Sequence, residues 1–282
     1  MKPFPARVLS IQYRIRILLV LVVSLLMAGT AFGQESHLKK LDQVVWITEQ
    51  YPPFSYLDDK DGQIKGLMVE ILLEMWKKVG LKKSKKDIII HPWARGIALL
   101  ENDPRVCLFG MGITKERQMK YKFVTSISPG VHGLIAKKTK GYHFSSIEAV
   151  NKAFSGKSHV IGVIRGDFGE KNFLEQGGNP HLLFKVSSGR QLIKMLEMDR
   201  LEMIAFGELP AISIMMRENI NYREYEIPIV SNELRSGFAF HKNVDPAVLI
   251  VLQQAMDEVT REGIADRFMK TYLQRLDLSQ KN

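Results

Sequence analysis

A glycine-containing turn in the sequence places an arginine where it can hold a small anion. Residues 110–114, Gly-Met-Gly-Ile-Thr, follow the apolar run 106–109 and lead into a short predicted helix that contains Arg117. Glycine lets a backbone come close to a ligand, and the start of a helix offers unpaired amide groups to an anion. Arg117 would add two parallel hydrogen bonds to a carboxylate. A lone arginine in such a position more often forms a surface salt bridge.

Aromatic side chains stand at the end of another predicted strand. The apolar run 44–47 is followed by Glu49, Tyr51, two consecutive prolines and Phe54. A β-branched and aromatic run that stops at prolines is typical of a strand ending in a rigid loop. Ligands of open α/β sheets bind at the carboxyl ends of strands, so Glu49, Tyr51 and Phe54 are candidates for one wall of a pocket. The alternative is a proline turn whose rings cover an edge of the core.

Residue types that carry out catalysis or bind metals are not grouped in the sequence. The single cysteine, Cys107, lies in an apolar run, which predicts a buried small hydrophobic residue and excludes an intramolecular disulfide. The seven histidines lack metal-ligand spacing, and the acidic cluster 58–62 lacks the ligand order of an EF-hand. There is no nucleophile beside a base and no phosphate loop. We therefore predict no metal, no cofactor and no catalytic centre.

The first 33 residues predict export. Residues 1–16 carry four basic and no acidic side chains, residues 17–27 are almost wholly apolar, and 31–33 fit a small-x-small cleavage pattern. We expect residues 1–33 to be a cleaved signal peptide and the mature protein to be periplasmic. The alternative is an uncleaved anchor, but the apolar run is shorter than the roughly 20 residues of a spanning helix. Four of the ten net positive charges lie in this segment, and we expect no nucleic-acid partner.

The elements that must position the candidate residues alternate between strands and helices. Strands are predicted at 44–47, 87–90, 106–109, 133–138, 159–164, 203–206 and 236–240; longer helices at 66–79, 91–101, 188–198 and from 245 onward; and shorter helices at 145–150, after 114 and after 167. Strands and helices that alternate with short links favour parallel sheets with right-handed crossovers. The sequence therefore predicts an α/β protein.

The order of these motifs resembles the family 3 periplasmic solute-binding proteins, the polar amino-acid-type receptors of ABC transporters. The resemblance covers about residue 41 to the C-terminus. It rests on four motifs: Glu49-x-Tyr51-Pro52-Pro53-Phe54-Ser55, Gly62-x-x-x-Gly66-x-x-x-Glu70-Ile71, Pro92-Trp93-x-Arg95, and Gly112-Ile113-Thr114-x-x-Arg117 followed by Tyr121-Lys122-Phe123. Each motif is weak alone, and their order along the chain makes the match specific.

The resemblance implies the type II two-lobe fold, in which each lobe is a mostly parallel sheet flanked by helices and two crossover strands join the lobes. We expect lobe 1 to comprise 41–135 and 237–282, and lobe 2 to comprise 136–236. The resemblance also implies that Arg117 holds a ligand carboxylate, with Arg95, Gly112 and Thr114 on the same lobe. Tyr51 would stack against the ligand and Trp93 would line the same cleft.

The second lobe departs from the family pattern in two places. The turn Arg165-Gly166-Asp167 matches the family's second anion-binding turn, where threonine usually follows the glycine. Asp167 would repel a carboxylate, so it either binds a cationic group of the ligand or caps a helix. At the end of the strand 203–206, amino-acid receptors carry an ammonium-binding aspartate, whereas this chain has Gly207 with Glu208 beside it. These departures put an ordinary α-amino acid in doubt, although Glu208 could serve from the next position.

The sequence thus predicts a monomeric binding protein that captures a small polar, carboxylate-bearing solute by hinge closure and delivers it to an ABC permease. Two alternatives remain. The first is a cleft enzyme of dehydratase type, with Glu49, Asp167 or Glu208 as general acid or base. The second is a ligand-sensing partner of a separate membrane receptor.

Overall fold

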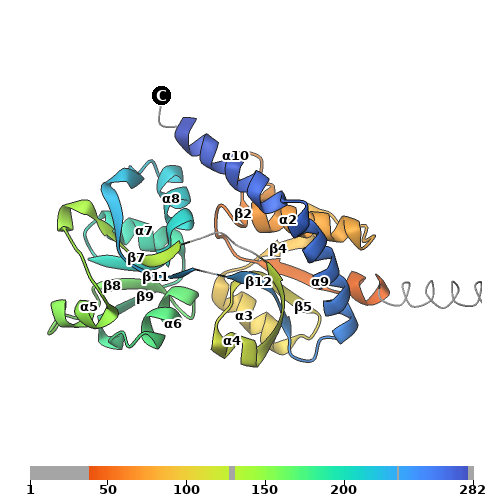
Figure 1. The fold of residues 1–282 in the computed structure, drawn as a ribbon, viewed down its shortest axis with the longest axis horizontal. Helices are drawn as coiled ribbons and strands as arrows, with labels where there is room; N and C mark the ends of the chain where they lie inside the picture. The colour runs from red at the N-terminus through yellow and green to blue at the C-terminus, as the bar shows by residue number, and fades with distance from the viewer. Residues whose placement is uncertain (1–37, 127–130, 234, 279–282) are drawn as a thin grey trace, which may run out of the picture. The chain divides into compact units, whose positions relative to one another are not determined.

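A computed structural model describes residues 38–126, 131–233 and 235–278 (Figure 1). The predicted signal peptide, 1–33, lies outside the described residues. Residues 44–282 form one unit, and the account that follows concerns its described part.

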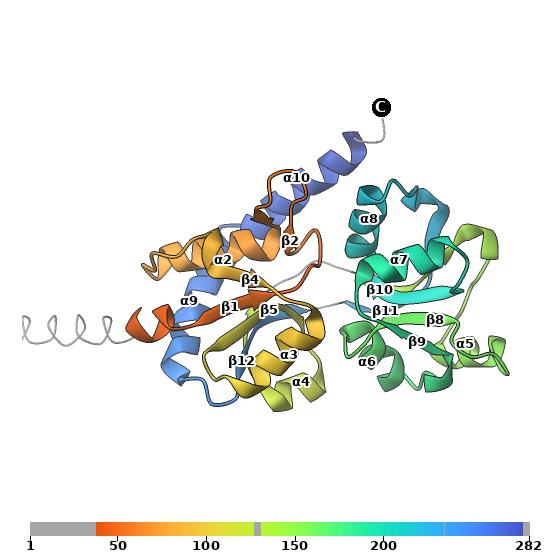
Figure 2. The ribbon, with the colours of Figure 1, turned by 180° about the vertical axis from the view of Figure 1, so that it is seen from behind.

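The first of two five-stranded sheets has the strand order β4-β1-β5-β12-β6. Strands β4, β1 and β5 are parallel, whereas β12 is antiparallel to both β5 and β6. Helices α2 and α9 lie on one face and α3 and α4 on the other (Figures 1 and 2). The bounds are β1 Val45–Thr48, β4 Ile88–Ile90, β5 Val106–Gly112, β6 Tyr121–Ser126, β12 Ser236–His241, α2 Leu67–Lys78, α3 Trp93–Asn102, α4 Lys115–Lys120, α9 Pro246–Arg261 and α10 Ile264–Leu278.

The second sheet has the order β11-β7-β10-β8-β9. Strands β10, β8 and β9 are parallel, and β7 is antiparallel to β10 and β11. Helices α5 and α6 lie on one face and α7 and α8 on the other (Figure 2). The bounds are β7 Val131–Lys137, β8 Ile161–Ile164, β9 Leu183–Val186, β10 Met203–Gly207, β11 Tyr225–Glu233, α5 Ile147–Ala153, α6 Phe168–Glu175, α7 Gly189–Glu197 and α8 Glu208–Arg217.

The fold is α/β with mixed sheets flanked by helices, which confirms the predicted class. The chain leaves the first sheet after β6, enters the second with β7, and returns between β11 and β12. The lobe boundary predicted at 135/136 falls inside β7, whose partners β10 and β11 both belong to the second sheet.

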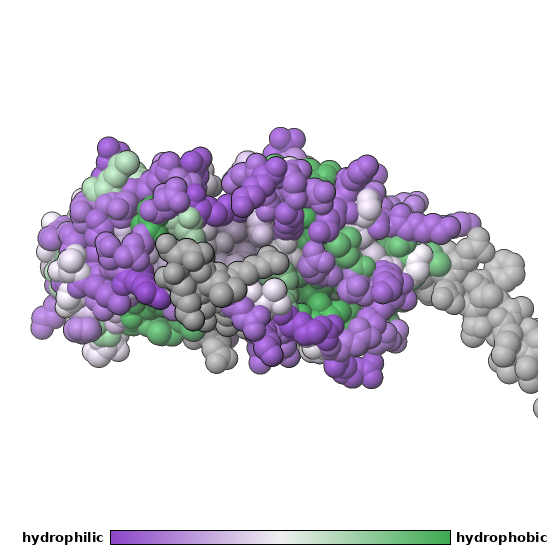
Figure 3. Space-filling view, turned by 90° about the horizontal axis from the view of Figure 1, so that it is seen from above, coloured by the Kyte–Doolittle hydropathy of each residue, from purple (hydrophilic) through white to green (hydrophobic). Residues whose placement is uncertain are grey.

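Each sheet has its own hydrophobic core. In the first, Trp46 of β1 is fully buried and packs edge-on against Trp76 of α2, with ring centroids 5.5 Å apart. Cys107 of β5 is also fully buried, as the sequence indicates, and burial raises the pKa of its thiol. In the second, Phe206 of β10 is buried among residues of α7 and α8. The face of the molecule in Figure 3 is mostly hydrophilic, with smaller hydrophobic areas between.

Side-chain caps fix where the two short site helices begin. The hydroxyl of Thr114 accepts the amide of Arg117 at 3.1 Å and starts α4. A carboxylate oxygen of Asp167 accepts the amide of Phe168 at 2.5 Å and starts α6. Such caps satisfy backbone donors that have no partner inside the helix. The capping role that the sequence allowed for Asp167 is therefore confirmed.

The loop between β1 and α2 is held by backbone contacts at Gly66. The amides of Leu67 and Met68 donate to the carbonyls of Pro53 and Phe54, at 3.0 and 2.8 Å. Gly66 has φ +130°, and a Cβ there would stand 2.4 Å from the Phe54 carbonyl oxygen. Only glycine fits this close approach, so Gly66 fixes the loop that carries Tyr51.

Candidate functional site

Arg117 lies at the centre of the candidate site. Its side chain is only 2 % exposed. One terminal nitrogen donates to the carbonyl of Gly112 at 2.8 Å, and the other donates to the carbonyl of Gly166 at 3.1 Å. The indole Nε1 of Trp93 donates to the same Gly166 carbonyl at 3.0 Å, and the guanidinium carbon lies 4.9 Å from the centre of the Trp93 ring. A buried guanidinium therefore joins the end of β5 to the turn that follows β8.

Two carboxylates lie near this arginine. Glu49 follows β1 and is partly buried, and Asp167 precedes α6 and is 8 % exposed. Burial raises the pKa of Glu49, the charge of Asp167 raises it further, and Arg117 opposes both. Burial likewise raises the pKa of Asp167, while Arg117 and the Phe168 amide lower it. Burial lowers the pKa of Arg117 and the two acids raise it, so the three groups share one electrostatic environment.

Tyr51 connects the loop after β1 to the end of β10. Its ring stacks on Phe54 at 5.9 Å and meets Phe206 edge-on at 5.4 Å. Its hydroxyl oxygen accepts a hydrogen bond from the backbone amide of Gly207. A Cβ at Gly207 would stand 2.9 Å from that hydroxyl oxygen, so the absence of a side chain lets Tyr51 approach. Burial, and then the charges of Asp167 and Glu49, raise the pKa of Tyr51.

The remaining predicted residues separate into those near Arg117 and those away from it. Gly112 and Thr114 hold Arg117 directly. Arg165 lines a cavity of about 320 Å³ together with Trp93, Lys185 and Gln191. Glu208 lines a different cavity of about 340 Å³, together with Met215 and Tyr222, which belong to the lobe of the second sheet. Arg95 is exposed on α3. The pKa of the nearby His91 is lowered by burial and, to a smaller extent, by the charge of Arg95.

Two buried residues behind the site were not predicted. Glu170 accepts the amide of Gly166 at 2.5 Å and pairs with Lys185 at 2.5 Å, so it fixes the carbonyl-bearing turn. The spacing of Asp167 and Glu170 is that of a capping box, a signal that was present in the sequence. His132 of β7 is 1 % exposed and meets Phe168 edge-on at 4.9 Å. Its position beside α6 depends on the pairing of β7 with β10, which no local pattern reveals.

Two searches of the described residues concern other kinds of site. Within residues 38–126, 131–233 and 235–278, no three or more His, Cys, Asp or Glu side chains are grouped to hold a metal ion. Over the same residues, no helix has the length and apolar character needed to cross a membrane.

Known structures share the fold. A histidine kinase sensor domain with similarity to periplasmic binding proteins aligns with TM-score 0.68 and 14% identity, over 82% of this chain and 96% of that one. A mutant of ArgBP from T. maritima aligns with TM-score 0.67 and 17% identity, over 83% and 99%. An ABC uptake transporter substrate-binding protein from Streptococcus pneumoniae with bound histidine aligns with TM-score 0.65 and 17% identity, over 81% and 93%.

No curated protein sequence matches the chain. The model of the bacterial extracellular solute-binding proteins, family 3, matches residues 44–275. This span is most of the chain and contains Glu49, Trp93, Arg117 and Asp167. The chain therefore belongs to the bacterial extracellular solute-binding proteins of family 3.

Proposed function

We propose that this protein binds a small polar solute between its two sheets, at Arg117. The observation that carries the proposal is the buried Arg117 guanidinium, which bonds carbonyl groups from both sheets and lies beside Trp93. Two carbonyl oxygens accept from its terminal nitrogens, but within the described residues no carboxylate makes a direct ion pair with it. A carboxylate that replaced the Gly166 carbonyl would make a shorter, charge-assisted hydrogen bond.

The groups around Arg117 indicate which solutes fit. Tyr51 and Trp93 offer aromatic faces, and Glu49 and Asp167 offer negative charge, so a solute with a carboxylate and a cationic or hydroxyl group suits the site. Gly207 has only a backbone amide at the place where amino-acid receptors of the family carry an aspartate, and Glu208 lies on a separate cavity. Glu49 or Asp167, not Glu208, would meet a cationic group of the solute.

The mechanism we propose is hinge closure. The two lobes are the sheets with their helices, and the solute binds the first lobe and recruits the second, so its greater affinity for the closed arrangement drives closing. In the exported protein, without its segment 1–33, the closed form would deliver the solute to an ABC permease. Amino-acid-binding proteins of ABC transporters among the structures with this fold support that partner.

A sensing role is the second candidate. The similarity to a histidine kinase sensor domain favours it, because the same fold there serves signalling. We propose no catalytic role, since a binding function accounts for the acids near Arg117.

A thermal-shift screen of the mature protein tests the proposal. Amino acids, polyamines, dicarboxylates and small peptides are added singly, and a solute that binds only the folded protein raises the melting temperature. We expect a solute with a carboxylate to give the largest rise. A flat response across all four classes would contradict the proposed function. Pull-down of a permease or of a membrane sensor with the loaded protein then identifies the partner.

A further inference from the structure

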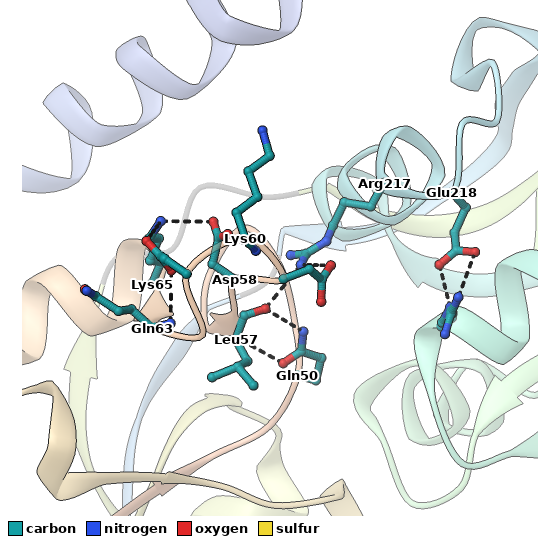
Figure 4. Close-up of polar contacts among 11 residues, drawn as sticks. Gln50, Leu57, Asp58, Lys60, Gln63, Lys65, Arg217 and Glu218 are labelled. Atoms are coloured by element: carbon teal, nitrogen blue, oxygen red, sulfur yellow. Dashed lines mark hydrogen bonds and ion pairs between the residues drawn. The ribbon is translucent and has the colours of Figure 1, made fainter.

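Arg217 connects the two sheets at a place separate from the candidate site. It is the last residue of α8, beside the second sheet, and its side chain reaches the hairpin formed by β2 (Tyr56–Leu57) and β3 (Ile64–Lys65), which precedes α2 (Figure 4). One terminal nitrogen donates to the Asp59 carboxylate at 2.6 Å and to the Leu57 carbonyl at 3.1 Å. The guanidinium carbon also lies 4.8 Å from the centre of the Tyr56 ring.

The hairpin that receives Arg217 is held in shape by its own contacts. The side chain of Gln50 contacts the backbone of Leu57 twice. Its Oε1 accepts a hydrogen bond from the Leu57 amide at 2.9 Å, and its Nε2 lies 3.4 Å from the Leu57 carbonyl oxygen (Figure 4). Lys65 pairs with Asp58 at 3.1 Å and with Asp61 at 2.7 Å across the turn. The Leu57 carbonyl that accepts from Arg217 therefore has little freedom to move independently of the hairpin.

The helix end that presents Arg217 is held as well. The next residue, Glu218, accepts from Arg190 of α7 at 2.5 Å and pairs with Lys194 of the same helix at 3.1 Å. Figure 4 shows Arg217 between the hairpin and Glu218. Arg217 is thus fixed to α7 and α8, so it moves with the second sheet.

The hairpin and helix α8 are each adjacent in sequence to a residue of the candidate site. Gln50, which contacts Leu57, is the neighbour of Tyr51, and α8 begins at the residue after Gly207. Tyr51 and Gly207 are in contact at the site, while Arg217 and the hairpin are in contact at the opposite end of α8. A movement that separates the sheets would break both contacts.

We propose that Arg217 and the β2–β3 hairpin form an interlobe latch, which favours the closed arrangement of the lobes whether or not a solute is bound. The inference rests on the proposed hinge closure. The ion pair alone is weak, since Asp59 is 83% exposed and surface pairs contribute little. Arg217 itself is only 26% exposed, and its contacts with the Leu57 carbonyl and the Tyr56 ring add to the pair.

The separation of the lobes can be measured in the solute-free protein by pulsed electron resonance between spin labels. Exposed Lys86 and Glu175 are changed to cysteine for labelling, and Cys107 stays unlabelled because it is fully buried. We expect Arg217→Met to raise the ratio of open to closed molecules by roughly fivefold, the size of one weak ion pair with a cation–π contact. Asp59→Asn should cause a smaller shift in the same direction.

Arg105→Met is the matched control, because Arg105 forms an ion pair with Asp103 of the same lobe, so the pair does not cross between the lobes. It should leave the distance distribution unchanged. Asp59→Asn keeps the test decisive if Arg217→Met fails to fold, since Asp59 is a surface residue. Distributions that are the same in the wild type, Arg217→Met and Asp59→Asn would overturn the latch.

The latch and the proposed function can fail separately. A solute that raises the melting temperature of the wild type and of Arg217→Met, with no change of distances between them, would leave solute binding intact and overturn the latch alone. A wider distribution in Arg217→Met with a flat solute screen would support the latch and contradict the proposed function.

Discussion

His132 should make the stability of the second lobe depend on pH, and the perturbation that reveals this is His132→Gln. The ring lies behind the candidate site, at the register position opposite Gly207, and it packs on Phe168. Burial lowers the pKa of His132 to about 3. The unfolded chain keeps a histidine pKa of about 6.5.

The sign follows from these two pKa values. Above pH 6.5 neither state binds the proton, and His132 adds no pH dependence. Between pH 6.5 and about 3 the unfolded chain binds a proton that the folded chain does not, so acid favours unfolding. The contribution of His132 to the free energy of unfolding should fall by about 1.4 kcal/mol per pH unit. Between pH 6.5, where the unfolded ring is already half protonated, and pH 4.5 the loss is about 2 kcal/mol.

Urea unfolding of the wild type and of His132→Gln at several pH values measures the effect. The difference between their free energies of unfolding should shrink by about 2 kcal/mol from pH 6.5 to 4.5, because the variant lacks the titrating ring. His181→Gln, which removes an exposed histidine, is the control and should not reproduce this trend. A constant difference over this range, or an NMR titration of His132 with a midpoint near 6.5, would refute the reasoning.

Two further predictions concern the loop after β1. Gly66→Ala should lower the free energy of unfolding by about 2–4 kcal/mol, because its Cβ would meet the Phe54 carbonyl in a backbone conformation that favours glycine. Gly62→Ala, whose Cβ meets open space at φ +65°, should cost about 1 kcal/mol in the same urea experiment, and equal losses would show that the close contact is unimportant. Glu49→Gln should raise the melting temperature at pH 7, because burial and Asp167 raise the pKa of Glu49 and make its ionised form unfavourable. That gain should vanish near pH 4, where the unfolded glutamate is protonated too, and a gain of the same size at both pH values would exclude this cause.

Local signals account for the features that the sequence predicted well. The turn at Gly112 and the cap at Thr114 place Arg117 in the first turn of α4, and the pair of prolines lies in the loop that follows β1. Each of these depends on residues within a few positions of one another. The family motifs join such local pieces, which explains why the α/β class and the family were predicted.

The features that were missed depend on contacts between distant segments. The partner of Tyr51 is the amide of Gly207, and this follows from the packing of one lobe on the other. Glu208 is next to Gly207 in sequence, yet as the first residue of α8 it lines a separate cavity. The mixed character of the first sheet comes from the long return of β12 between β5 and β6, and that of the second from the antiparallel strand β7; local periodicity specifies neither.

The affinity of wild type and Arg117→Ala for the best solute of the thermal-shift screen tests the central claim most directly. Arg105→Ala, an exposed arginine paired with Asp103, is the control for loss of one positive charge. Isothermal titration calorimetry on folded samples should give an affinity roughly 10- to 100-fold weaker for Arg117→Ala, as expected when a hydrogen bond to a charged group is lost, and an unchanged affinity for Arg105→Ala. Equal affinities of Arg117→Ala and the wild type would contradict a solute site at Arg117.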